Sequence, residues 1–200
     1  MTNDHSYNTI EKPATAEFKD RGSKFLAYAY PIQTVDEFKA RLSELKKEHP
    51  KAVHHCFAYR IGTDRIQFRT NDDGEPSGTA GKPILGQIDS KELTNILIVV
   101  VRYFGGTLLG VPGLINAYKT SAAMTLEQTT IIKKDITKDL KIQFDYSLIN
   151  EIMMILKKFD CEIEKREMGL FCVFEMKVPI RNFEQSYQLI KSIKGVEIVS

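Results

Sequence analysis

The stretch NILIVVVRYFGGTLLGVPGLINAY, residues 95–118, decides how the first half of the chain folds. Its apolar run, Ile96 to Val101, is rich in β-branched residues, which predicts a strand buried on both faces. Arg102 ends this run, and two aromatic residues and a glycine-rich turn follow it. Pro112 suits the first turn of a helix, because proline lacks the amide hydrogen that would be unpaired there. The stretch therefore predicts a buried strand, a loop and a helix in succession.

Shorter elements are expected on either side of this strand. In the N-terminal part, strands are predicted at 15–18, 24–30, 53–60 and 64–70, and helices at 34–49 and 84–88. In the C-terminal part, strands are predicted near 140–146, 162–168, 171–178 and at the chain end, with helices at 148–159 and 183–193. The second set has the order β-α-β-β-α-β, which is the ferredoxin-like arrangement. We therefore predict an α+β protein of two domains, residues 1–134 and 135–200.

Composition excludes several classes of protein. The net charge of +2 over 200 residues is too small for a polybasic nucleic-acid binder, although it permits a local basic patch. The N-terminal residues MTNDHSYNTI have no apolar core, so they do not resemble a signal peptide. The longest apolar run falls well short of the roughly 20 residues that span a bilayer. Cys56, Cys161 and Cys172 form no CxxC pair, which argues against a disulfide framework or a zinc knuckle. We expect a cytoplasmic protein without a membrane partner, a metal or a cofactor.

The loop DDGEPSGTAGKP, residues 72–83, is the first stretch that could bind a ligand. Consecutive amides at the start of a helix form an anion-binding nest, and Lys82 would add positive charge. The loop is not a P-loop, because Pro76 replaces the first glycine and Pro83 replaces the Ser or Thr that holds magnesium. Three interpretations stay open, namely a capped turn, an anion site and a catalytic loop.

The loop after the buried strand is the second such stretch. Ligands of open α/β folds tend to sit beyond the carboxyl end of a buried strand, which is where Arg102 lies. Gly105 and Gly106 would let the backbone approach a ligand, and the arginine could hold a phosphate through two hydrogen bonds. Alternatively, Arg102 pairs with an acid such as Asp72 or Asp73, and the aromatic residues beside it belong to the core.

The adjacent pair His54-His55 does not predict a metal site. Neighbours in a strand point to opposite faces, so both imidazoles cannot serve one site without distortion. No cysteine or carboxylate has the spacing of a zinc ligand set. A triad built on Ser77 would lack the nucleophile elbow, and Cys56 is expected in the core. We assign no catalytic residue.

Together, the two glycine-rich stretches resemble the IMPACT family of small cytosolic proteins. Arg102 to Gly110 is close to the family signature Arg-aromatic-aromatic-Gly-Gly-x-x-Leu-Gly, with Leu109 in the leucine place. The resemblance covers roughly residues 15–130, and the last 66 residues are similar to the C-terminal domain of bacterial members.

The resemblance implies a fold and a field of function. The N-terminal domain should resemble the α+β domain shared by a small-subunit ribosomal protein and domain IV of elongation factor G. The C-terminal domain should resemble the ferredoxin-like domain V of that factor. Eukaryotic relatives are linked to the control of translation initiation through a general-control kinase, by way of an extra N-terminal domain. For bacterial members the resemblance implies only nucleic-acid or ribosome binding.

The leading hypothesis is a non-enzymatic protein that binds RNA, the ribosome or a regulatory component of translation through the glycine-rich loops. The residues assigned to this ligand- or anion-binding role are Glu75, Ser77, Gly78, Thr79, Gly81, Lys82, Arg102, Gly105, Gly106, Gly110 and Lys119. The alternative is a hydrolase or transferase acting on a phosphorylated or nucleotide-like ligand, with Asp72, Asp73, Glu75 and His55 around the same loops. A third class is a protein-interaction module that uses the C-terminal sheet face.

Overall fold

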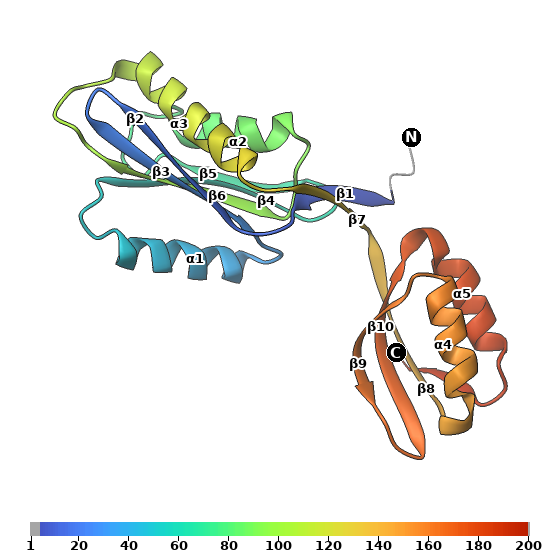
Figure 1. Ribbon diagram of the computed structural model, residues 1–200. Coiled ribbons are helices and arrows are strands. Elements are labelled where there is room, and N and C mark those ends of the chain that lie inside the picture. The colour runs from blue at the N-terminus through green and yellow to red at the C-terminus, as the bar shows by residue number, and fades with distance from the viewer. Residues whose placement is uncertain (1–4, 200) are drawn as a thin grey trace. The chain divides into compact units, whose positions relative to one another are not determined.

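The computed structural model describes residues 5–199 as a mixture of helices and strands (Figure 1). The strands are β1 (Ser6–Ile10), β2 (Ala14–Asp20), β3 (Ser23–Pro31), β4 (His54–Ile61), β5 (Gln67–Asn71), β6 (Ile96–Tyr103), β7 (Ile131–Asp135), β8 (Thr137–Asp145), β9 (Glu162–Glu167), β10 (Phe171–Pro179) and β11 (Val196–Val199). The helices are α1 (Val35–Glu48), α2 (Gly81–Ser90), α3 (Gly110–Glu127), α4 (Ile149–Lys158) and α5 (Ile180–Ser192), with a 3-10 turn at Tyr146–Leu148. None of the helices described over this range is long and apolar enough to cross a membrane.

Contacts divide the described chain into two compact units. The first unit is Tyr7–Lys134, and the second comprises residues 5–6 together with 135–199. The mixed α and β character agrees with the predicted fold class. That each unit folds independently stays a prediction.

The first unit is built on a five-stranded antiparallel sheet in the order β2-β3-β6-β4-β5. The central strand is β6, and its residues 96–102 are all buried, as the apolar run predicted. Helices α2 and α3 cover one face of the sheet and α1 covers the other (Figure 1). The sheet therefore has a core on each face.

The antiparallel arrangement corrects one step of the sequence argument. The rule that ligands lie beyond the carboxyl ends of strands applies to parallel sheets, whereas β6 runs antiparallel to both β3 and β4. The position of Arg102 at the end of β6 therefore does not by itself predict a ligand site. Whether Arg102 can bind a ligand depends on the contacts that it makes.

Helix α1 begins where the helix at 34–49 was predicted, with Thr34 as its cap. The Thr34 hydroxyl accepts the Glu37 amide at 3.2 Å, and the Glu37 carboxylate accepts the Gln33 amide at 2.9 Å. These bonds resemble a capping box whose return bond goes to Gln33, one residue before the cap. The small sheet of β1 and β7 was not predicted, because β1 lies in a polar lead-in and its partner is more than 100 residues away.

The second unit has the predicted ferredoxin-like topology. Its antiparallel sheet has the strand order β11-β8-β10-β9, and α4 and α5 pack on one face. Alternate residues of β8 and β10 point into this core, among them Ile142, Phe144 and Phe174. The specific likeness to elongation factor G stays a prediction.

Gly105 gives a test of the first unit's fold. A Cβ atom added to Gly105 would lie 1.9 Å from the carbonyl carbon of Gly22, so the two backbones must move apart. We expect Gly105→Ala to lower the free energy of unfolding by about 1–3 kcal/mol, measured by urea denaturation. The control is Gly86→Ala in α2, where the added methyl meets nothing within 4 Å. It should stabilise the protein by up to about 1 kcal/mol, since alanine is the better helix former. Equal unfolding curves for Gly105→Ala and the unchanged protein would contradict the close approach.

Candidate functional site

A buried ion pair ties the first glycine-rich loop to the end of β6. Arg102 Nη1 lies 2.5 Å from Glu75 Oε1, and the two residues are only 5% and 8% exposed. The Tyr118 hydroxyl, from α3, donates to the same Glu75 oxygen at 2.8 Å. One carboxylate of the 71–80 loop thus joins β6 to α3. An acid does hold Arg102, as one of the two interpretations expected, but that acid is Glu75 rather than Asp72 or Asp73.

Aromatic rings and a serine complete the surroundings of Arg102. Its guanidinium carbon lies 5.4 Å from the centroid of the Phe25 ring and 5.7 Å from that of Phe104, distances at which cation–π attraction operates. Arg102 Nη2 donates to Ser23 Oγ at 3.4 Å, and the amide of Gly105 donates to the same oxygen at 3.2 Å. The arginine is therefore coupled to the glycine turn that follows it.

The predicted anion nest is filled by the chain's own Asp72. Its carboxylate accepts the amides of Gly78 at 2.8 Å, Ala80 at 3.0 Å and Gly81 at 2.8 Å. Burial alone would raise the pKa of Asp72, but these hydrogen bonds together lower it below its usual range. The amides at the start of α2 thus already hold an anion that belongs to the protein.

A thiol and a phenol lie beneath the loop. Cys56 Sγ donates to the Asp72 carbonyl at 3.0 Å and contacts the Tyr118 hydroxyl oxygen at 3.3 Å. Burial raises the pKa of both Cys56 and Tyr118 far above their ordinary values. The two groups therefore stay protonated and act as hydrogen-bond donors rather than as nucleophiles.

The two histidines face opposite sides of the sheet, as predicted. His54 Nδ1 lies 2.7 Å from the Asp73 carbonyl, and its Nε2 lies 3.8 Å from Glu75 Oε1. His55 is 8% exposed on the α1 side, and its backbone amide donates to the Asp73 carboxylate at 2.6 Å. Across the described residues, no group of three or more His, Cys, Asp and Glu side chains could hold a metal ion.

The predicted site residues separate into a buried and an exposed set. Buried members are Glu75, Thr79, Gly81 and Arg102, with Gly78 partly buried. Exposed members are Ser77, Lys82, Gly105, Gly106, Gly110 and Lys119. The sequence analysis did not assign Ser23 or Tyr118 to this cluster, although Tyr118 ends the stretch 95–118 that decides the fold.

Apolar side chains are exposed where the signature loop enters α3. The exposed fractions are 48% for Phe104, 82% for Leu108, 51% for Val111 and 38% for Ile115. Val111, Ile115 and Lys119 are four residues apart along α3, so they share one helix face. We call Phe104, Leu108, Val111 and Ile115 the signature-loop patch.

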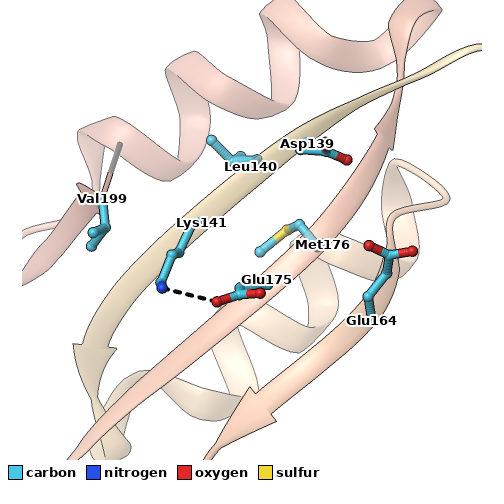
Figure 2. Close-up of a pocket in the computed structure, with 7 residues that line it drawn as sticks. All are labelled: Asp139, Leu140, Lys141, Glu164, Glu175, Met176 and Val199. Atoms are coloured by element: carbon cyan, nitrogen blue, oxygen red, sulfur yellow. Dashed lines mark ion pairs between the residues drawn. The ribbon is translucent and has the colours of Figure 1, made fainter.

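The open sheet face of the second unit was the predicted site for a protein partner. A hollow in this sheet has a volume of about 340 Å³, and the Lys141–Glu175 ion pair at its lining is 2.9 Å long. Figure 2 shows the residues that line it and marks this ion pair with a dashed line. A second ion pair joins Lys177 to Glu164 across neighbouring strands. The charges on this face thus neutralise one another, and a protein partner there stays a prediction.

Fold and site define a class of protein, namely a mixed α/β chain whose first sheet carries a glycine-rich loop above a buried Arg–Glu pair. The Impact N-terminal domain matches residues 21–126. IMPACT family member YvyE of Bacillus subtilis is 37% identical over 183 residues, covering 84% of each chain. The chain belongs to the IMPACT family, as its motifs predicted.

Two solved structures are also similar. A crystal structure described as a hypothetical protein is 30% identical, covers 98% of this chain and 97% of its own, and has a TM-score of 0.73. A structure described as the two-domain translational regulator Yih1 is 30% identical over 61% of this chain and 47% of its own, with a TM-score of 0.37.

Removing one partner of the buried ion pair tests its structural role. Arg102→Met would leave the Glu75 carboxylate buried beside an apolar side chain, which costs about 3–5 kcal/mol of unfolding free energy. The double variant Arg102→Met with Glu75→Gln removes both charges and should regain part of this loss. A single variant within about 0.5 kcal/mol of the unchanged protein in urea denaturation would exclude this role.

Burial of His55 predicts a pH dependence of stability. Burial lowers the pKa of His55 below its ordinary value of 6.5, and the nearby Asp73 only partly opposes this effect. Below pH 6.5 the unfolded chain therefore takes up a proton that the folded protein refuses. The free energy of unfolding should fall as the pH drops from 7 through 6.5 toward the folded pKa. His55→Gln, compared by urea denaturation at each pH, should flatten this dependence, and an unchanged slope would contradict the assignment.

Proposed function

We propose that this protein is a non-enzymatic binding protein in the regulation of translation. It contacts RNA, the ribosome or a regulatory component of translation through the exposed parts of its glycine-rich loops, in the cytoplasm. Membership of the IMPACT family supports this field of function. Within that proposal, a likeness of the two units to domains IV and V of elongation factor G would suit a ribosomal partner.

An exposed loop next to a buried ion pair is the observation that carries the proposal. The Arg102–Glu75 pair fixes the signature loop from beneath, while Phe104 and Leu108 remain 48% and 82% exposed. Large apolar side chains held in water on a fixed loop are typical of a binding surface. An exposed phenylalanine can stack on an unpaired base or pack against a protein.

In this proposal, Lys82 and Lys119 are the residues that contact phosphate groups. Lys82 and Lys119 are exposed, and neither takes part in an ion pair among residues 5–199. Arg102 is neutralised by Glu75, and the amides at the start of α2 are occupied by Asp72. Arg102 and Glu75 therefore position the loops, and the lysines supply the charge that a phosphate backbone attracts.

Binding is favoured over catalysis by how the polar groups are used. Glu75 already accepts from Arg102 and Tyr118, and Asp72 already accepts three amides. A general base or a nucleophile needs a lone pair that is free to reach a substrate. Two of the acids proposed for a hydrolase or transferase, Asp72 and Glu75, are instead bound to groups of the protein itself.

Salt dependence of RNA binding tests the proposal. The full chain is titrated with single-stranded polyuridylate at four salt concentrations. Two lysine–phosphate contacts should give a log–log slope of about −1.4, from roughly −0.7 per contact on a single strand. Lys119→Ala should bring the slope to about −0.7, because one contact is lost. Leu108→Ser should weaken binding at every salt concentration without changing the slope.

A control variant and a second probe show whether binding is specific to the proposed surface. Lys177→Ala, on the sheet of the second unit, should leave both affinity and slope unchanged. The same titration with ribosomes purified from Bacillus subtilis covers a protein or structured-RNA partner. Failure of the unchanged protein to bind either probe at low salt would refute the proposal. Ribosome binding that Leu108→Ser abolishes and Lys119→Ala leaves intact would reassign the contact to a ribosomal protein.

A further inference from the structure

The edge strand β5 differs from the other edges of the two larger sheets. The larger sheet of the first unit ends in β2 and β5, and the sheet of the second unit ends in β9 and β11. An edge strand leaves every second pair of backbone N–H and C=O groups without a partner, so it can accept another strand. Proteins usually prevent this with charged side chains or with very short edges.

Three of these edges carry such protection. In β9, five of the six residues are charged. In β2, Glu17 pairs with Lys19 and Lys24 at 2.8 Å each, which sets a row of charges along the edge. The strand β11 has only four residues.

By contrast, β5 presents apolar side chains at its start. Phe68 is 54% exposed, and Ile66, directly before the strand, is 76% exposed. The sequence of the strand, QFRTN, holds one cation and no acid. This edge therefore offers both unpaired backbone groups and apolar surface to an incoming chain.

The ring of Phe68 is held in place. The guanidinium carbon of Arg60 lies 5.1 Å from the centroid of the ring. Arg60 is itself fixed by Asp89, which accepts from its Nε at 2.9 Å, and by the carbonyl of Arg65. The contact with Arg60 restricts the ring of Phe68, which reduces the conformational entropy lost when its exposed half is covered.

Arg69 indicates the charge of the partner. It follows Phe68 and so points to the other face of the sheet, where it is exposed. No ion pair involving Arg69 is formed within the described part of the chain. A second copy of β5, paired antiparallel around its middle, would set the two Arg69 side chains opposite or diagonal to one another. Like charges at those positions are unfavourable, whereas an acid there is attracted.

We propose that β5 binds an extended segment of another protein as an additional strand. The segment carries apolar residues on the face that meets Phe68 and acidic residues on the face that meets Arg69, so apolar and acidic residues alternate along it. This surface is separate from the one proposed for translation. It would bind through the main chain, with Phe68 as the anchor.

The probe is an eight-residue peptide of alternating valine and glutamate, capped at both ends. It is titrated into the full chain while backbone amide resonances are followed by NMR. Residues 66–70 should shift, and their amides should exchange more slowly with water. A peptide with proline in place of a central valine should lose binding, since a backbone donor is removed. Lysine in place of glutamate should weaken binding about tenfold or more.

Variants of the protein separate this site from nonspecific adsorption. Phe68→Lys should weaken binding by about tenfold or more, because the anchor is lost and the edge gains a charge. The matched control is Phe171→Lys, at a residue of the second unit that is 62% exposed, and it should leave the affinity unchanged. Should Phe68→Lys fail to fold, Arg69→Glu serves instead. This variant should bind the glutamate peptide more weakly than the unchanged protein does, and the lysine peptide more tightly.

Several outcomes would overturn the inference. They are shifts confined to residues outside β5 and its neighbour β4, affinity that the proline peptide retains, and no shift at millimolar peptide. Concentration-dependent dimerisation that Phe68→Lys abolishes, seen by sedimentation, would make a second copy the occupant and also refute it. Loss of RNA and ribosome binding would leave this result untouched, so the two proposals fail separately.

Discussion

A buried arginine destabilises a fold unless its charge is matched, and Arg102 is matched by Glu75. Taking two such charges out of water costs several kcal/mol for each ion, which is offset only where hydrogen bonds and contacts are well arranged. Here the carboxylate also receives the Tyr118 hydroxyl, and the guanidinium lies against two aromatic rings. The pair ties the 71–80 loop, the end of β6 and the middle of α3 to one point, so the rest of the candidate site depends on it.

This constraint explains the character of the site. Groups that suggest a catalytic or phosphate-binding site in the sequence form hydrogen bonds to one another in the structure. The clearest case is Asp72, whose carboxylate accepts the amides at the start of α2. Glycine is required at 105 because the backbone there touches Gly22, and not because a ligand approaches. The polar groups of the interior are therefore engaged with one another, and what reaches solvent is a loop with apolar side chains, followed on one face of α3 by Lys119. Such a surface is suited to recognising a macromolecule.

Sequence patterns predicted those features that depend on neighbours along the chain. The β-branched run of β6 and the β-α-β-β-α-β order of the second unit follow from patterns along the chain, whereas the fold of the first unit was expected from the family resemblance. Three-dimensional choices were beyond such patterns. An acid partner for Arg102 was foreseen, but three acids lie within four residues of one another, and only folding decides that Glu75 is the one that turns inward. The β1–β7 pairing and the antiparallel setting of β6 likewise depend on contacts between distant segments.

The two proposed surfaces of the first unit differ in both position and physics. Helix α3, which carries Val111 and Ile115 of the signature-loop patch, packs over β2 and β3, whereas β5 lies at the opposite edge of the same sheet. Lysine–phosphate contacts weaken with salt, while added-strand pairing rests on the main chain and on an apolar anchor, which salt affects little. The two surfaces differ in chemistry, but they approach each other at Lys82, because α2 packs against β4 and β5. The two proposals together assign a nucleic-acid or ribosomal partner and an extended protein segment to different residues of the first unit.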